Sequence, residues 1–229
     1  MKLGIIGNGR AAWAFASTWR RIGWPLTGIA TRGEPIEELA ATSDIILVAV
    51  SDRAIEEVAA TIPETNAIIV HPSGALPALR GGFSLHPLKS LPPVGEPSDL
   101  RDTLLVFEGS HRDVAEAIAT KIGARFAEIA RDAKTRYHAG AVFGSNYIAA
   151  LLDVAEELIG IDGARDDIAA LARSAIDNWA AHGDARRFTG PAARGDAAVL
   201  QRHEEVLRDS PELAEIYRLL AARIVAAAK

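Results

Sequence analysis

Near its N-terminus the chain reads Leu3-Gly4-Ile5-Ile6-Gly7-Asn8-Gly9-Arg10-Ala11-Ala12, a short apolar run that leads into the spacing G-x-G-x-x-A. The residues that follow, as far as Ile22, have helical length and contain no proline. The pattern therefore predicts a strand, a glycine turn and a helix, the setting in which this spacing binds a dinucleotide. There, Gly7 permits the tight turn, and Gly9 lets a pyrophosphate approach the backbone at the helix N-terminus. We expect the cofactor to be bound by Gly7, Asn8, Gly9, Arg10, Ala11 and Ala12.

The end of the second predicted strand bears on which dinucleotide binds. NAD-binding folds commonly carry Asp or Glu there to bind the ribose hydroxyls. This chain instead has Ala30-Thr31-Arg32. Thr31 can donate a hydrogen bond and Arg32 can pair with a 2′-phosphate, so we expect NADP rather than NAD. In the alternative interpretation, Arg32 is a solvated loop residue and Glu34 or Glu37 reaches back to the ribose.

Short apolar runs recur through the first half of the chain and alternate with helical stretches. They predict strands at 26–30, 44–50, 67–70, 83–85, 103–107 and 125–128, with helices at 55–62 and 111–122. This alternation implies an α/β fold, a Rossmann-type, mostly parallel sheet covered on both faces. Ligands bind outside the carboxyl ends of parallel strands, so Val50, Ser51, Asp52 and Ser73 are also expected to bind the cofactor. In the alternative, Asp52 only caps a helix and Ser73 belongs to a plain turn.

After Asp132 no further strand-like run occurs, and apolar residues recur at helical spacing. Helices are predicted at 165–181, 196–208 and 211–227, with breakers at Gly183 and at Thr189-Gly190-Pro191. We therefore divide the chain into an NADP-binding Rossmann domain, 1–130, and an all-helical substrate and dimerisation domain, 131–229. The alanine-rich helices expose more apolar surface than one small bundle can cover, so we expect a homodimer.

Composition excludes several classes of protein. The 229 residues include 25 basic and 30 acidic ones, a net charge of −5, which argues against a nucleic-acid partner. There is no cysteine, and the six histidines fall in no H-x-x-x-H or H-E-x-x-H pairing, so no metal site is expected. The N-terminal apolar run is too short for a signal peptide or a membrane span, so we expect a cytoplasmic protein with no membrane partner.

The whole chain resembles a Rossmann-like family whose helical C-terminal domain is a domain of unknown function. The residues that carry the resemblance, beyond the glycine loop, are His86-Pro87-Leu88, Tyr137-His138, Ser145-Asn146, Thr189-Gly190-Pro191, Arg194-Gly195-Asp196 and His203. The family looks like a branch of the superfamily of 6-phosphogluconate dehydrogenase, 3-hydroxyisobutyrate dehydrogenase, ketopantoate reductase and pyrroline-5-carboxylate reductase. The resemblance implies an N-terminal dinucleotide-binding domain and an all-helical second domain that often forms a dimer, with the active site in the cleft between them.

Related hydroxyacid dehydrogenases carry a catalytic lysine and, four residues later, an asparagine on the first long helix of the second domain. Asn146 matches that asparagine, but the lysine position falls on Val142, which cannot donate a proton. His138 lies one turn earlier on the same helical face and is our first candidate for the proton donor. Lys134, a further turn back, lies close to the predicted helix start and is given no role.

A reductase needs a polar group that protonates the developing alkoxide or amine. His86 lies at a strand's carboxyl end and is our second candidate; the His-Pro segment is similar to one in prephenate dehydrogenases. In the alternatives, His86 is a core histidine, and His138 and Asn146 form hydrogen bonds between helices.

Substrate contacts are assigned to Ser145, Arg194, Asp196 and His203. Ser145 and His138 are seven residues apart and are expected to share a helix face, as are Asp196 and His203. The resemblance favours a carboxylate-binding or dimer-spanning role for Arg194. In the alternative, Asp196 is a helix N-cap and Arg194 a surface loop residue.

Three functions follow from these observations. The first is an NADPH-dependent reductase, or the reverse dehydrogenase, acting on a small carbonyl or imine acid. The second is a non-catalytic NADP-binding module that regulates or interacts through its helical domain, and the absent lysine keeps this alternative open. The third is a reductase that uses a deazaflavin coenzyme.

Overall fold

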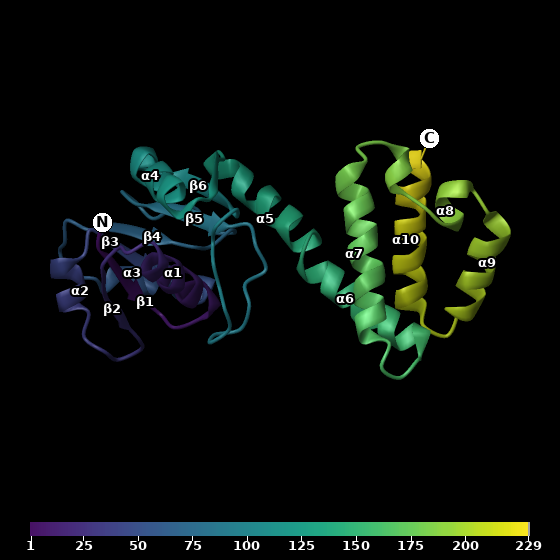
Figure 1. The fold of residues 1–229 in the computed structure, drawn as a ribbon, viewed down its shortest axis with the longest axis horizontal. Helices are drawn as coiled ribbons and strands as arrows, with labels where there is room; N and C mark the ends of the chain where they lie inside the picture. The colour runs from purple at the N-terminus through teal and green to yellow at the C-terminus, as the bar shows by residue number, and fades with distance from the viewer. Residues whose placement is uncertain (229) are drawn as a thin grey trace. The chain divides into compact units, whose positions relative to one another are not determined.

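The computed structural model describes residues 1–228, which form two compact units (Figure 1). The first unit spans Met1–Tyr147 and the second begins at Ile148. Helix α5, Lys134–Phe143, therefore packs with the sheet, although the change from strands to helices placed the predicted boundary near residue 131.

The first unit contains one seven-stranded sheet in the order β2-β1-β3-β4-β5-β6-β7. Strands β1 to β5 run parallel, β6 pairs antiparallel with β5, and β7 pairs parallel with β6. The predicted mostly parallel α/β sheet is confirmed. The strands are β1 Leu3–Ile6, β2 Leu26–Ala30, β3 Ile45–Val48, β4 Ile68–His71, β5 Phe83–Pro87, β6 Leu104–Gly109 and β7 Arg125–Glu128.

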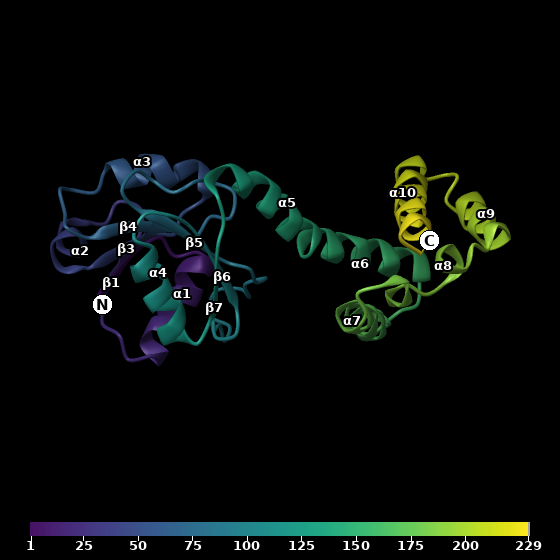
Figure 2. The ribbon, with the colours of Figure 1, turned by 90° about the horizontal axis from the view of Figure 1, so that it is seen from above.

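Helices cover both faces of this sheet (Figure 2). Successive residues of a strand point to opposite faces. Thus Leu47 packs with helices α1, Arg10–Arg21, and α4, Arg112–Ile122, while its neighbour Ile46 packs with the other face's helices. Those are α3, Ile55–Ala60, and α2, Glu37–Thr42, a six-residue helix that the sequence pattern did not predict. Both faces are buried, which explains the uninterrupted apolar runs of the central strands.

The second unit is helical. Its helices are α6 Asn146–Ile159, which begins at the end of the first unit, α7 Arg165–Ala181, α8 Pro191–Arg194, α9 Ala197–Val206 and α10 Pro211–Ala228. Helix α10 packs against α8 and α9. Within residues 1–228, no helix combines the length and apolar character needed to cross a bilayer.

Candidate functional site

A groove opens where the chain leaves β1, beside the end of β3. In the sheet, β2 lies on one side of β1 and β3 lies on the other, so the strand order reverses at β1. A doubly wound sheet binds ligands at such a point, outside the carboxyl ends of its strands. The cavity measures about 1070 Å³. Its walls include Gly7, Asn8, Gly9, Arg10, Ala11, Thr31, Arg32, Val50 and Ser51, all predicted to bind the cofactor.

The two loop glycines differ in what their backbone requires. Gly7 has φ +118°, and a Cβ built on it would lie 2.3 Å from the carbonyl oxygen of Ala49. Gly9 has an ordinary φ of −76°, and a Cβ there would meet no protein atom within 4 Å. The fold therefore requires a glycine at position 7, whereas the open space at Gly9 lies on the groove side and is free for a ligand.

The first turn of α1 fits a diphosphate. Gly9 occupies the N-cap without a side-chain hydrogen bond, and the first turn contains no acidic residue. The positive end of the helix therefore faces no capping anion of its own. Ala12 is 1% exposed and packs the helix on the sheet rather than lining the groove.

At the end of β2 the groove wall carries charges of both signs. Arg32 is exposed, and Glu34 accepts hydrogen bonds from the backbone N–H of Thr31 and from its hydroxyl. The hydrogen bonds from Thr31 lower the pKa of the Glu34 carboxyl. Arg32, the cation predicted to pair with a 2′-phosphate, thus lies in the groove wall. Both donors of Thr31 form hydrogen bonds with the Glu34 carboxylate.

A second group of polar residues lies at the ends of β4 and β5 and is here called the α5 cluster: Ser73, His86, Lys134, Tyr137 and His138. It adjoins the groove through Asp52, which follows Ser51 of the groove wall. The Ser73 hydroxyl donates a hydrogen bond to Oδ2 of Asp52 at 2.9 Å. The same hydroxyl accepts the backbone N–H groups of Ala75 and Leu76.

His86 is the centre of the α5 cluster. Its Nδ1 lies 2.6 Å from the Tyr137 hydroxyl, and its ring centroid lies 6.0 Å from that of His138, edge to face. Gly74 lies against both rings, since a Cβ on it would lie 2.7 Å from Cδ2 of His138 and 3.0 Å from the His86 ring. Burial lowers the pKa of His86 to about 4, helped by His138 and Lys134, so the ring is neutral at pH 7.

Lys134 is buried at the first turn of α5, with only 2% of its surface exposed. Its Nζ donates hydrogen bonds to the Ser73 carbonyl oxygen at 3.1 Å and to the Ser84 hydroxyl at 2.5 Å. Burial lowers the pKa of Lys134 to about 8, against the opposing pull of the Glu108 and Asp52 carboxylates. Lys134 thus lies beside Ser73 in the α5 cluster, although the sequence pattern offered no reason to assign it a role, and a buried lysine of lowered pKa is a candidate member of a functional site.

His71, the last residue of β4, supports the loop that carries Ser73. Its Nδ1 accepts the Ser73 backbone N–H at 3.3 Å, so its proton lies on Nε2 and is donated to the Pro77 carbonyl at 3.1 Å. Burial lowers the pKa of this fully buried ring. His71 thus has structural partners on both nitrogens.

Ser145 and Asn146 do not continue the helix of His138. Helix α5 ends at Phe143 and α6 begins at Asn146, so the predicted shared helix face of His138 and Ser145 is wrong. The break falls at Gly144, a residue that disfavours helix interiors. The Ser145 hydroxyl lies 2.6 Å from the Ala141 carbonyl oxygen and 2.9 Å from Oδ1 of Asn146. Asn146 itself is exposed.

The remaining predicted substrate residues lie in the second unit. Asp196 is the N-cap of α9, and its side chain accepts a hydrogen bond from the Val199 N–H. This is the N-cap alternative to a substrate contact. Nδ1 of His203 lies 2.7 Å from the Tyr217 hydroxyl, and Arg194 is exposed at the end of α8.

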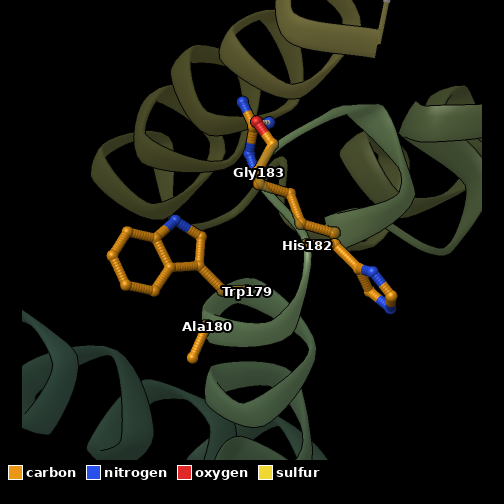
Figure 3. A pocket seen from close by; sticks show the side chains of 5 residues that line it. Trp179, Ala180, His182 and Gly183 are labelled. Carbon is orange, nitrogen blue, oxygen red and sulfur yellow. Dashed lines mark hydrogen bonds between the residues drawn. The ribbon is translucent and has the colours of Figure 1, made fainter.

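A shallow hollow of about 410 Å³ also lies in the second unit, after α7. In Figure 3 the Trp179 indole and the His182 imidazole point away from each other. The hollow therefore does not gather polar groups around one point, unlike the α5 cluster.

Sequence reasoning named Ser73, His86 and His138 but missed Lys134 and Tyr137 as members of one cluster. A signal was present. Lysine is unfavourable at a helix N-terminus, and residues 134, 137 and 138 have the spacing i, i+3, i+4 of one helix face.

The fold and groove define a Rossmann-type protein with a following helical unit. Residues 104–224 match the family described as Domain of unknown function (DUF2520), and the chain belongs to this family, which confirms the resemblance found in the sequence. A search of curated proteins finds no match.

Solved structures share the fold. A Bacteroides fragilis protein, provisionally named an NADP oxidoreductase, matches with a TM-score of 0.82 at 20% identity over 98% of both chains. A Thermotoga maritima protein matches with a TM-score of 0.77 at 23% identity, over 99% of this chain and 98% of that one. A reductive aminase from Aspergillus terreus, in complex with NADPH and ethyl levulinate, matches with a TM-score of 0.70 at 16% identity, over 98% and 93%.

Proposed function

We propose that this protein is an NADP-dependent oxidoreductase that transfers a hydride between NADPH and a small carbonyl or imine acid. The observation that carries the proposal is the open space at Gly9. A side chain there would meet no protein atom within 4 Å, so the fold does not require glycine, and its absence leaves the start of α1 accessible to a diphosphate. Arg32 in the groove wall favours the 2′-phosphate of NADP. The NADPH complex of the reductive aminase, a protein of the same fold, supports this choice.

The α5 cluster is the proposed place of the chemistry, because Asp52 joins it to the groove. NADPH, when bound, supplies the hydride. His138 and His86 are proposed to hold the substrate oxygen or nitrogen and to supply a proton, and Asn146 to assist them. Ser145, Arg194, Asp196 and His203 remain predicted substrate contacts.

We also propose that the protein is a homodimer formed through its helical unit. The buried apolar residues of that unit are few: Ile168, Ala192, Leu207 and Ala214. Large apolar side chains are exposed instead, among them Leu171 at 65%, Trp179 at 65% and Val206 at 78%. A second copy would cover such a surface.

Titration with NADPH tests the cofactor site. Gly9→Ala should weaken NADPH binding at least about tenfold by obstructing the diphosphate, while the melting temperature stays unchanged. Gly140→Ala is the matched control, since Gly140 also has open space around it, and it should leave the affinity unchanged. Undiminished binding by Gly9→Ala would contradict the proposed site.

NADPH oxidation with keto and imino acids then tests the reaction. Turnover on either class supports the oxidoreductase. Tight NADPH binding without turnover on the panel would favour a non-catalytic NADP-binding module, and an absorbance change of a deazaflavin mixed with NADP and the protein would select the deazaflavin reductase.

A further inference from the structure

The contact between Tyr137 and His86 is specific in geometry. The Tyr137 hydroxyl lies 2.6 Å from Nδ1 of His86, and the rings meet edge to face with centroids 5.5 Å apart. Their positions are 51 residues apart in the chain, on α5 and β5. Both side chains are half-buried, so the hydrogen bond is protected from competing water.

This hydrogen bond determines which nitrogen of His86 carries the proton. Burial raises the pKa of Tyr137 to about 12, so the phenol keeps its proton at neutral pH. Among residues 1–228 the hydroxyl has no other hydrogen-bond partner, so Nδ1 is the protein atom to which its O–H can donate. A neutral imidazole that accepts at Nδ1 is protonated at Nε2.

The opposite nitrogen of His86 is available to a substrate. No described residue forms a hydrogen bond with Nε2, and this atom is not among the buried polar atoms without a partner, so it reaches solvent. The backbone of Gly74 lies against the ring and leaves no room for a side chain there. When Nε2 is protonated, His86 presents a single N–H donor, whereas among residues 1–228 the side chain of His138 has no hydrogen-bond partner.

We infer that Tyr137 is a positioning residue that holds His86 as its Nε2–H tautomer, and that this makes His86 the proton donor of a site that reduces carbonyl acids. The inference rests on the proposed function and deepens it. As the carbonyl carbon is reduced, the His86 Nε2–H bond breaks and an O–H bond forms on the substrate oxygen. The phenol proton moves to Nδ1 as this happens, and it returns to Tyr137 when Nε2 takes up a proton from water, which restores the starting tautomer.

The same geometry disfavours an imine acid. An iminium nitrogen carries its proton before reduction and has no lone pair to accept the His86 N–H. A carbonyl oxygen instead gains negative charge as it is reduced, and a preset N–H donor stabilises that charge.

The test is long-range ¹H–¹⁵N NMR of the full-length, ¹⁵N-histidine-labelled protein. The wild type should show His86 protonated on Nε2 and bare on Nδ1. Tyr137→Phe keeps the ring but removes the hydroxyl, so His86 should become a mixture of tautomers. Turnover of a 2-keto acid should fall about 10- to 100-fold in that variant, while NADPH affinity changes less than about twofold.

Tyr147→Phe is the matched control, since Tyr147 is 50% exposed and its ring pairs with that of Phe143, outside the α5 cluster. It should change neither the tautomer nor turnover. Wild-type His86 protonated on Nδ1 would overturn the inference without any variant having to fold. So would an unchanged tautomer in Tyr137→Phe, or faster reduction of a cyclic imino acid than of the keto acid. Failure of NADPH to bind is a different result, because it removes the proposed function and leaves the tautomer measurable.

Discussion

Oε2 of Glu34 lies 2.5 Å from the backbone nitrogen of Thr31 and 2.9 Å from its hydroxyl, so one carboxylate binds both donors at the end of β2. Arg32 lies between these two residues in the chain and in the same groove wall. The neighbouring cation and anion act in opposite directions on a 2′-phosphate, which allows their effects to be measured separately.

Arg32→Ala should reduce the preference for NADPH over NADH. We expect the wild type to bind NADPH more tightly, because the guanidinium pairs with the 2′-phosphate. Arg32 is exposed, so its loss should narrow the ratio of the two dissociation constants by roughly three- to tenfold. Equal affinities in the unmutated protein would show that Arg32 is a solvated loop residue.

Glu34→Gln should change the same ratio in the other direction. The amide keeps the shape of the side chain but removes the negative charge, so NADPH should bind up to about fivefold more tightly. NADH lacks the phosphate and should not gain. The affinities are measured by calorimetric titration. Equal gains in affinity for NADPH and NADH would mean that Glu34 acts only by holding the loop after β2 and not through its charge.

Gly74→Ala should displace the two histidines of the α5 cluster. The new Cβ would lie 2.7 Å from Cδ2 of His138 and 3.0 Å from Cδ2 and Cε1 of His86. The rings must move to relieve these contacts, and a misplacement of about 1 Å at reacting groups can lower turnover about 100-fold. NADPH affinity should stay unchanged because the groove is not touched; Gly140→Ala again serves as the control, and a variant of normal activity would place the chemistry elsewhere.

Lys134 should make stability depend on pH above neutrality. Burial lowers its pKa from 10.5 to about 8, opposed by Glu108 and Asp52 and reinforced by Arg131. Between these pH values the unfolded chain binds more protons than the folded one, so the free energy of unfolding rises with pH. The rise due to Lys134 is up to about 3 kcal/mol.

Lys134→Met removes this contribution. Urea denaturation of both proteins from pH 7.5 to 10.5 should therefore show the wild type gaining stability relative to the variant. Parallel curves would mean that Lys134 has an ordinary pKa in the folded protein.

Light scattering at micromolar concentration should give the mass of a dimer. Ile216, Leu219 and Leu220 have the spacing of one face of α10 and are 43%, 62% and 45% exposed. Leu219→Glu should therefore yield a monomer, whereas Val94→Glu, at an apolar residue of the first unit that is 53% exposed, should not. A monomeric wild type would refute the proposed dimer.

The parts of the fold that depend on local pattern were predictable from the sequence. The apolar runs around Ile5 and Leu47 mark strands because both faces of the sheet are buried. A run does not encode strand direction, so the antiparallel pairing of β6 with β5 could not be foreseen. Helix α2 has only six residues, too few for a periodic pattern.

In the candidate site, too, some residues follow from a local sequence pattern and others depend on contacts between distant parts of the chain. The residues of the glycine loop from Gly7 to Ala11 are contiguous, so a local pattern was enough to place them in the groove wall. Lys134 owes its burial to Ser73 and Ser84, which are 61 and 50 residues away, so no local pattern revealed it. Asp196, by contrast, caps its own helix through a residue only three positions away, so the N-cap alternative could be stated from the local sequence.

The α5 cluster is assembled from both sides of residue 104, where the family match begins. Lys134, Tyr137 and His138 lie inside the matched segment, and Ser73, Gly74 and His86 lie before it. A phenol at position 137 has no acceptor without the imidazole at position 86, so relatives should keep or lose the two together, with glycine retained at position 74 wherever both histidines occur. Substitutions at positions 86 and 137 are therefore expected to occur together among relatives. An alignment that shows this must extend before residue 104, into the part of the chain that forms the sheet.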